Sequence, residues 1–316
     1  MSGETVAGVD WAGGKWLAIV LKDGAREEYL REEHLSSIWE SDWDFDRILI
    51  DVPIGLPHDE ETLDKREILD SAARSVTGRP GSVFPAPSRG ACEAAKDGDD
   101  YETVAEQNQD DIGKGLSKQS YNIAAAIGEV DAFLRENGAA SEVVIESHPE
   151  VCFRGLLGEQ LTHSKKTAQG IGERLKALDG HLDNPSVVFG EICRDLDHES
   201  GEIDVDDVID ALGLAVVAAY PEEDLNFLPH DKEYRDGAKF RCEWPTGAKI
   251  GSRDGYRSSF SEGIGRLGEC RLRQISIDLQ NRGEPRRKFR TRACASPTPA
   301  RWRVTCVATS ERSSGG

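Results

Sequence analysis

The chain has 316 residues, of which 38% are hydrophobic and 31% are charged, and its formal net charge is −19. This length suits one large domain or two small ones, and the composition is typical of a soluble globular protein. No apolar run approaches the roughly 18 residues that span a bilayer, and the first residues do not join a basic segment to an apolar one. We therefore expect no membrane span, no signal peptide and a cytoplasmic location.

The negative charge is confined to one part of the chain. Residues 238–316 carry 17 Lys and Arg against 7 Asp and Glu, whereas residues 1–237 carry 22 against 51. So acidic a domain repels itself in dilute salt, and it becomes tolerable near molar salt, where the Debye length is about 3 Å. The composition therefore favours a halophilic protein, and unfolding on dialysis into low salt would support this hypothesis.

The basic segment over residues 238–316 shows no sustained periodicity and is rich in Arg, Ser, Gly and Cys. One interpretation is a disordered basic arm that binds nucleic acid. The other is translated sequence that is out of frame, and this interpretation is favoured because the acidic bias reverses so abruptly. We predict a domain over residues 1–237, followed by this tail.

The first part of the domain predicts a β-meander. Three β-rich segments, 6–11, 16–21 and 27–33, are separated by short turns that contain Gly. A short helix over 35–39 precedes a fourth strand over 47–52, whose continuous apolar run is typical of a central strand covered on both faces. Residues 58–116 are acidic and partly helical in composition, and we interpret them as an insertion after this fourth strand.

The second part of the domain predicts mainly helices. A helix over 117–137 has apolar residues at helical spacing. One more strand is expected over 142–145, and further helices over 151–160, 167–180 and 206–220. This order predicts an α/β fold with a mixed five-stranded sheet and flanking helices.

Two aspartates lie near the ends of predicted strands. Asp10 is near the end of the first strand, where a carboxylate is costly to bury unless it is paired or bound to metal. Asp51 ends the most apolar strand of the chain. Ligands of open α/β sheets gather beyond the carboxyl ends of strands, so both are candidate site residues. The alternative is an edge position that faces solvent.

The final helix adds Asp207 and Asp210, whose i, i+3 spacing places both on one face. Asp207 could instead stabilise the helix dipole beside Asp204 as the N-cap, but Asp210 lies a turn further in. Carboxylates from distant segments, without a Cys or His cluster, indicate a hard cation such as Mg²⁺ or Mn²⁺. Two such ions about 3.5–4 Å apart would clamp the attacking and leaving oxygens of a phosphodiester cleavage.

An ordered set of motifs resembles a known family. The set contains Gly8-Val9-Asp10, Ile50-Asp51-Val52-Pro53, Glu146-Ser147-His148-Pro149-Glu150 and Asp207-Val208-Ile209-Asp210-Ala211, with further matches at 82–87 and 164–167. Over residues 5–235 the chain is similar to the predicted RNase H-like nuclease family, domain of unknown function 429, as a haloarchaeal-type member. The resemblance implies an RNase H-like fold, four metal-binding aspartates (Asp10, Asp51, Asp207 and Asp210) and a nuclease or phosphodiesterase that uses two metal ions.

Other residues near these motifs are candidates for the same site. Glu146, His148 and Glu150 follow the fifth strand; Glu150 is favoured as a site residue, and His148 is either a proton carrier or structural. Cations suit contacts with substrate phosphates, although each could instead pair with one of the many acids. These candidate cations are Arg74, Arg79, Arg89, Lys165, Lys166 and Arg174.

The expected partner is a nucleic acid or nucleotide. Because the domain is acidic, it is poorly suited to tight nonspecific binding of DNA, and a small or structured substrate fits as well as a long duplex. One alternative is an ATP-binding phosphotransferase of the actin and sugar-kinase type, since Gly13, Gly14 and Lys15 follow Asp10. A second glycine-rich phosphate motif, which that class needs, is not found. The other alternative is a non-catalytic scaffold of RNase H-like fold, which would keep the four aspartates but not bind metal.

Overall fold

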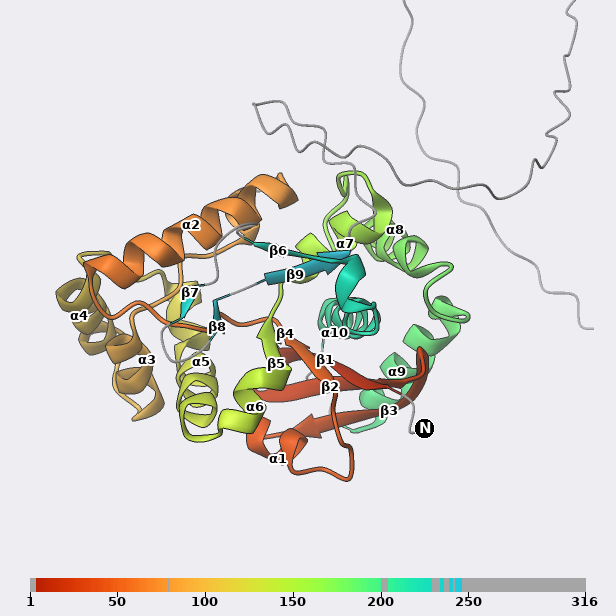
Figure 1. The fold of residues 1–316 in the computed structure, drawn as a ribbon, viewed down its shortest axis with the longest axis horizontal. Coiled ribbons are helices and arrows are strands. Elements are labelled where there is room, and N and C mark those ends of the chain that lie inside the picture. Colours follow the sequence, from red (N-terminus) through yellow and green to blue (C-terminus); the bar gives the residue numbers. More distant parts are fainter. Residues whose placement is uncertain are drawn as a thin grey trace, which may run out of the picture. The chain divides into compact units, whose positions relative to one another are not determined.

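A computed structural model describes residues 4–78, 80–199, 204–228, 234–235, 239–240 and 242–245 (Figure 1). By its contacts the chain divides into one unit of residues 1–257 and another of residues 258–316, and every described residue lies in the first. Arg79 and most of the predicted tail lie outside the described residues. The predicted boundary after residue 237 therefore stays a prediction.

A five-stranded mixed sheet forms the centre of the described part, as the sequence predicts. Strands β1 (Thr5–Ala12), β2 (Lys15–Lys22) and β3 (Ala25–Glu32) form an antiparallel meander. Strands β4 (Arg47–Ile50) and β5 (Val144–Glu146) continue the sheet by parallel pairing. The strand order is β3-β2-β1-β4-β5, which is consistent with an RNase H-like fold.

The two hairpin turns of the meander follow from their residues. Gly13 and Gly14 join β1 to β2, and Asp23 and Gly24 join β2 to β3, all four with positive φ. Positive φ at both central residues defines the type I′ turn, which matches the twist of the flanking strands. The Gly13-Gly14 pair thus has a structural explanation in the hairpin.

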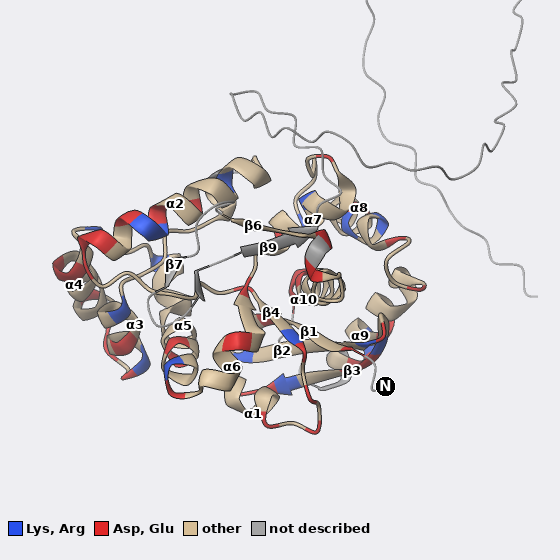
Figure 2. Cartoon of the chain, viewed as in Figure 1, with Lys and Arg blue, Asp and Glu red and all other residues tan. Residues whose placement is uncertain are grey.

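Helices cover the sheet and fill the insertion. They are α1 (Leu35–Trp39), α2 (Glu60–Thr77), α3 (Arg89–Lys96), α4 (Tyr101–Ile112), α5 (Lys118–Glu136), α6 (Gly138–Val143), α7 (Pro149–Leu157), α8 (Ala168–Leu178), α9 (Pro185–Glu199) and α10 (Val205–Ala218). The predicted insertion holds α2, α3 and α4, and Asp and Glu are spread over these helices and the beginning of α10 (Figure 2). None of the described helices is both long and apolar enough to cross a membrane.

The sheet separates two apolar layers. Leu17, Ile19 and Leu49 face a core that includes α7, α8, α9 and α10, whereas Ile48 and Ile50 face a second core that includes α1 and α5. Successive side chains of a strand point to opposite faces, so the apolar run of β4 serves both layers. The predicted double coverage of this strand is confirmed.

Helix α10 packs directly on β1, and this contact positions the candidate site. A Cβ atom on Gly8 would collide with backbone atoms of Ala211 and Ala215, so only glycine permits this approach. Gly8 and Asp10 lie on the same face of β1, because they are two residues apart. Asp10 is therefore directed toward the helix that carries Asp210.

Among the described residues after α10, four short strands are present. Strand β6 (Leu225–Leu228) pairs with β9 (Cys242–Pro245), and β7 (Tyr234–Arg235) pairs with β8 (Lys239–Phe240). Strands β8 and β9 lie beyond residue 237, in the segment for which the sequence predicts no regular structure. Their short length explains why they give no periodic signal.

Candidate active site

The four predicted aspartates come together at one end of β1 and β4. Asp10 lies near the end of β1, and Asp51 follows β4 directly, where its N–H donates to the Val9 carbonyl across the parallel pair (3.0 Å). Asp207 and Asp210 lie in the first two turns of α10. The parallel pairing of β1 with β4 and the packing of α10 on β1 therefore bring three separate segments to one place.

Burial and mutual repulsion disturb the ionisation of these carboxyl groups. Burial raises the pKa of Asp10 well above its ordinary value, and the nearby carboxylates of Asp51 and Asp210 raise it further. Burial also raises the pKa of Asp51, although His148 and Lys165 oppose the change. Burial raises the pKa of Asp210 to about 7 and that of Asp207 to about 6. Perturbed carboxyl groups that cluster in this way are typical of functional sites.

Asp207 has a structural role as well. Its Oδ2 atom accepts a hydrogen bond from the Asp204 N–H (3.3 Å), and Asp204 is the N-cap of α10. Asp204 is thus the N-cap that the sequence predicts, and the hydrogen bond from its N–H to Asp207 is a further structural role, typical of a capping box. Asp210 has no such role, since it is only 1% exposed and its Oδ1 atom is buried without a hydrogen-bond partner.

Lys165 lies among the aspartates. Its Nζ atom contacts Asp210 Oδ2 and lies 3.6 Å from Asp206 Oδ2. Burial alone would lower the pKa of Lys165, but the carboxylates, above all Asp210, raise it above its ordinary value. The sequence predicts a phosphate-binding lysine here, and in the structure its ammonium group is a counter-ion of the acidic cluster.

The segment before α8 fixes the backbone of Lys165. Thr167 caps α8: its Oγ1 atom accepts from the Gly170 N–H (3.1 Å) and donates to the Ser164 carbonyl (2.8 Å). A Cβ atom on Gly170 would collide with the Ser164 carbonyl, so the segment packs tightly on the first turn of the helix. Lys166 is the more exposed neighbour, with its Nζ 3.8 Å from Asp206 Oδ2.

Arg174 and Glu150 form a buried ion pair beside this segment. The guanidinium group of Arg174 contacts Glu150 Oε1 and donates to the carbonyls of Gly170 (2.9 Å) and His163 (3.4 Å). From the sequence, Arg174 is a candidate for contact with a substrate phosphate, but its side chain is 0% exposed and so does not reach the surface. Its contacts instead join α7 to the segment that carries Lys165.

Glu146 and His148 have structural partners. Arg66 donates to both carboxylate oxygens of Glu146 (2.6 Å each), and the Ile54 N–H donates to Oε2 (2.8 Å). The His148 ring caps α7, because Nδ1 accepts from the Glu150 N–H (3.1 Å) while Nε2 lies 2.8 Å from the Ser82 carbonyl. Of the two interpretations of His148, these contacts favour the structural one.

Two further predicted cations, Arg74 and Arg89, have partners outside the aspartate cluster. Arg74 donates to the Val83 carbonyl (3.1 Å), and Arg89 pairs with Asp131 (3.0 Å). Arg79 is not among the described residues. Of the five candidate cations that the structure describes, Lys165 and Lys166 form ion pairs within the acidic cluster.

Two charged residues that take part in the ion pairs of this region were not predicted from the sequence. Asp206 is buried beside Lys165, and Arg66 pairs with Asp70 (2.8 Å) as well as with Glu146. The i, i+4 spacing of Arg66 and Asp70 on a helix is the one local signal that indicated a pair there. Asp206 carries no signal beyond its place at a helix start.

The chemistry of the cluster's side chains suits a hard divalent cation, whereas their arrangement does not yet form a metal site. Within the described ranges, no three His, Cys, Asp or Glu side chains are already arranged around one point as metal ligands would be. However, carboxylate oxygens are the ligands that Mg²⁺ and Mn²⁺ prefer, and the buried Asp210 Oδ1 atom lacks a partner. Asp10, Asp51 and Asp210 are the residues that would hold such an ion, with Asp207 beside them.

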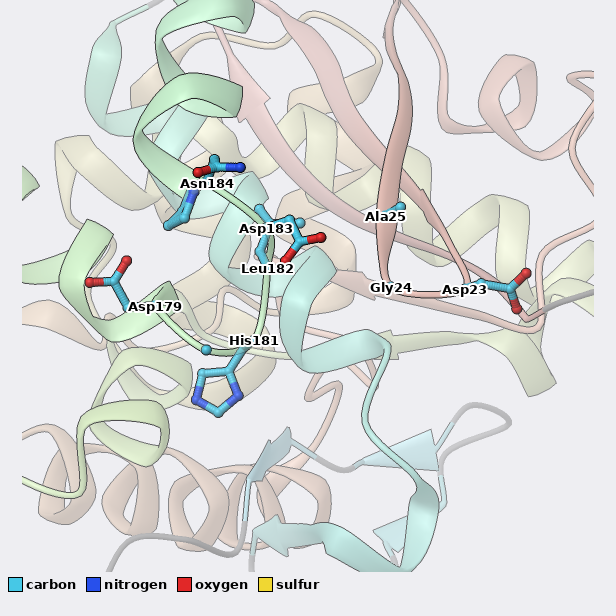
Figure 3. Close-up of a pocket in the computed structure, with 10 residues that line it drawn as sticks. Asp23, Gly24, Ala25, Asp179, His181, Leu182, Asp183 and Asn184 are labelled. Carbon is cyan, nitrogen blue, oxygen red and sulfur yellow. The ribbon is translucent and has the colours of Figure 1, made fainter.

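A separate hollow lies at the other end of the sheet. Its lining includes Asp23 and Ala25 of the β2–β3 turn and Asp179, His181 and Asn184 between α8 and α9 (Figure 3). Ala25 pairs with Lys22, which pairs with Thr5 at the start of β1. Since Asp10 is five residues further along the strand, the hollow is roughly 17 Å from the aspartates.

Comparison with known proteins finds one family. The model of the family described as "Protein of unknown function (DUF429)" matches residues 8–234. Neither a curated protein nor a solved structure matches the chain. The matched region contains all four aspartates and Lys165, so the site belongs to the part of the chain that the family model covers.

Proposed function

We propose that this chain, which belongs to the DUF429 family, is a metal-dependent nuclease or phosphodiesterase of RNase H-like type. One observation carries the proposal: Asp10, Asp51, Asp207 and Asp210 converge from two parallel strands and one helix. The strand order β3-β2-β1-β4-β5 supports the RNase H-like assignment. The proposed substrate is a nucleic acid or a nucleotide.

The electrostatics of the cluster support a requirement for a cation. Burial and the neighbouring carboxylates raise the pKa of Asp10, and burial raises that of Asp210 to about 7. A bound cation would favour the ionised forms, because an opposite charge within a few ångströms lowers a carboxyl pKa. Mg²⁺ or Mn²⁺ in this place would activate a water molecule and neutralise charge on the scissile phosphate.

The chain's own residues supply position and charge. Asp10 and Asp51 are held by the paired strands, and Asp210 is held by a helix that is buried on nearly all sides. Lys166 is exposed at the edge of the cluster and is the candidate for contact with a substrate phosphate. Glu150 pairs with Arg174, and its carboxylate also acts on the site by raising the pKa of Asp51.

The acidic surface supports a haloarchaeal-type, cytoplasmic protein as part of this proposal. Residues 1–237 carry 51 Asp and Glu against 22 Lys and Arg, and salt screens the repulsion that such an excess produces in the folded domain. Experiments on the chain therefore belong in molar KCl. Loss of folded structure on dialysis into low salt is the expected result, and indifference to salt would contradict it.

A thermal-shift titration tests the proposed metal site. The full chain in molar KCl is titrated with Mn²⁺ or Mg²⁺, beside Asp10→Asn and the surface control Asp110→Asn on α4. We expect both ions to raise the melting temperature of the wild type and of the control, and to leave Asp10→Asn nearly unchanged. An equal response of all three chains would contradict the proposal.

A substrate panel tests the activity. Labelled single strands, duplexes, junctions and a small phosphodiester are incubated with the chain and Mn²⁺, beside Asp51→Asn. We expect cleavage of at least one substrate by the wild type and none by the variant. A chain that neither binds metal nor cleaves any substrate would favour the non-catalytic scaffold, which the ion pair of Lys165 with Asp210 also suits.

A further inference from the structure

We infer that Lys165 permanently supplies one of the positive charges that the aspartate cluster needs, so that the site takes a single divalent cation and not two. This inference rests on the proposed function and specifies its metal requirement. It concerns the chain's own lysine, whose position is set by the fold.

The first argument is the place of the ammonium group. Lys165 Nζ contacts Asp210 Oδ2 and lies 3.6 Å from Asp206 Oδ2. Although the Lys165 side chain is 31% exposed, its ammonium group directly contacts the buried carboxylate of Asp210. At such a separation unlike charges attract strongly.

The second argument is the unequal environment of the two oxygens of Asp210. Oδ2 is taken by Lys165, whereas Oδ1 is buried and has no hydrogen-bond partner. A buried carboxylate oxygen without a partner is costly, and it marks the place for one cation. A second ion bound by Oδ2 would have to displace the lysine.

The third argument is that the lysine is held in place. The Thr167 cap and the close contact of Gly170 with Ser164 fix the backbone on both sides of Lys165. The buried Arg174 fastens the same segment to α7 through Glu150. The backbone from which the Lys165 side chain reaches the cluster is therefore set by packed structure.

Lys166 provides a matched comparison. It belongs to the same segment, but its side chain is 70% exposed and its Nζ lies 3.8 Å from Asp206 Oδ2. The Lys165 side chain is 31% exposed. Replacing either lysine with methionine removes one positive charge, so a difference between the two variants reports the position of the charge and not the net charge.

Counting bound Mn²⁺ ions tests the inference. The full chain in molar KCl is titrated with Mn²⁺, free ion is followed by electron paramagnetic resonance, and only ions lost in a matched Asp10→Asn background are counted. We expect one ion for the wild type, for Lys165→Arg and for Lys166→Met, and two for Lys165→Met. Circular dichroism confirms that each variant is folded.

Two ions in the wild type, or one ion in folded Lys165→Met, would overturn the inference while leaving the proposed metal-dependent function intact. A wild type that binds no ion dependent on Asp10 would contradict the proposed function itself. If Lys165→Met does not fold, Lys165→Gln replaces it. In either case, two Mn²⁺ ions bound by the wild type would by themselves contradict the inference.

Discussion

Gly8 on β1 lies against the Ala211 carbonyl of α10, so closely that a methyl group at position 8 would collide with it. This contact connects the fold to the site. Asp10 follows Gly8 on the same face of the strand, and Asp210 precedes Ala211 on the helix. The distance between the two acidic side chains thus depends on a glycine that carries no chemistry of its own.

Gly8→Ala is expected to lower the free energy of unfolding by about 3 kcal/mol, the upper part of the range for overpacking a core. Denaturant unfolding in molar KCl measures the change. The control is Gly172→Ala on the exposed face of α8, where a Cβ atom has open space. That variant is expected to gain about 0.5–1 kcal/mol, because alanine is favoured over glycine in a helix. Equal stability of the two variants would contradict the close packing of α10 on β1.

The elements with strong local signals could be predicted from the sequence. The Gly13-Gly14 and Asp23-Gly24 dipeptides need positive φ, and both form the turns of the predicted meander. The apolar run of β4 is buried on both faces, as expected of a central strand. Helix α6 escapes prediction because its six residues are too few to show a period.

The ion pairs could not be predicted from the sequence. Lys165 pairs with Asp210 across 45 positions, and Arg66 pairs with Glu146 across 80. Such pairs depend on which elements the fold places together, and neither periodicity nor spacing contains this information. For this reason Glu146 and Arg174 look like site residues in the sequence, while their contacts in the structure are those of supporting ion pairs.

Arg174→Met is expected to lower the free energy of unfolding by about 3–5 kcal/mol, because it leaves the Glu150 carboxylate largely buried without its partner. Denaturant titration at neutral pH measures the loss. The double variant Arg174→Met, Glu150→Gln is expected to recover part of it, since no buried charge then remains unpaired. A double variant that is less stable than the sum of the two single changes would contradict this account.

Arg66 and Lys65 offer a comparison of a buried pair with an exposed one on the same helix. Arg66→Met leaves Glu146 without its two hydrogen bonds of 2.6 Å and is expected to cost about 3–5 kcal/mol. Lys65→Met removes the ion pair with Glu61 (2.7 Å), whose side chain is 79% exposed. This change is expected to lower the free energy of unfolding by about 0.5 kcal/mol or less. Thermal and denaturant unfolding of both variants measure the contrast. Similar losses in the two variants would show that burial does not set the strength of these pairs.

The raised carboxyl pKa values predict how stability depends on pH without metal. Burial raises the pKa of Asp210 from 3.8 to about 7, and burial and neighbouring carboxylates also raise that of Asp10. Between the ordinary and the raised value, the folded chain holds more protons than the unfolded chain, so this contribution to stability is lost as pH rises. Stability in EDTA is therefore expected to fall from about pH 4 to about pH 8.

Asp10→Asn removes one of these carboxyl groups, and its amide oxygen can still accept the hydrogen bond that the Trp11 N–H donates to Asp10 (2.8 Å). At pH 8 in EDTA and molar KCl, the variant is expected to be more stable than the wild type by about 1–3 kcal/mol, the usual cost of a poorly satisfied buried polar group. The difference should shrink toward pH 4, where Asp10 is protonated in the folded chain. Denaturant unfolding at several pH values measures it, with Asp110→Asn as the exposed control. A variant that is less stable than the wild type at pH 8 would show that the Asp10 carboxylate is stabilised in the folded chain without metal, against the repulsion described here.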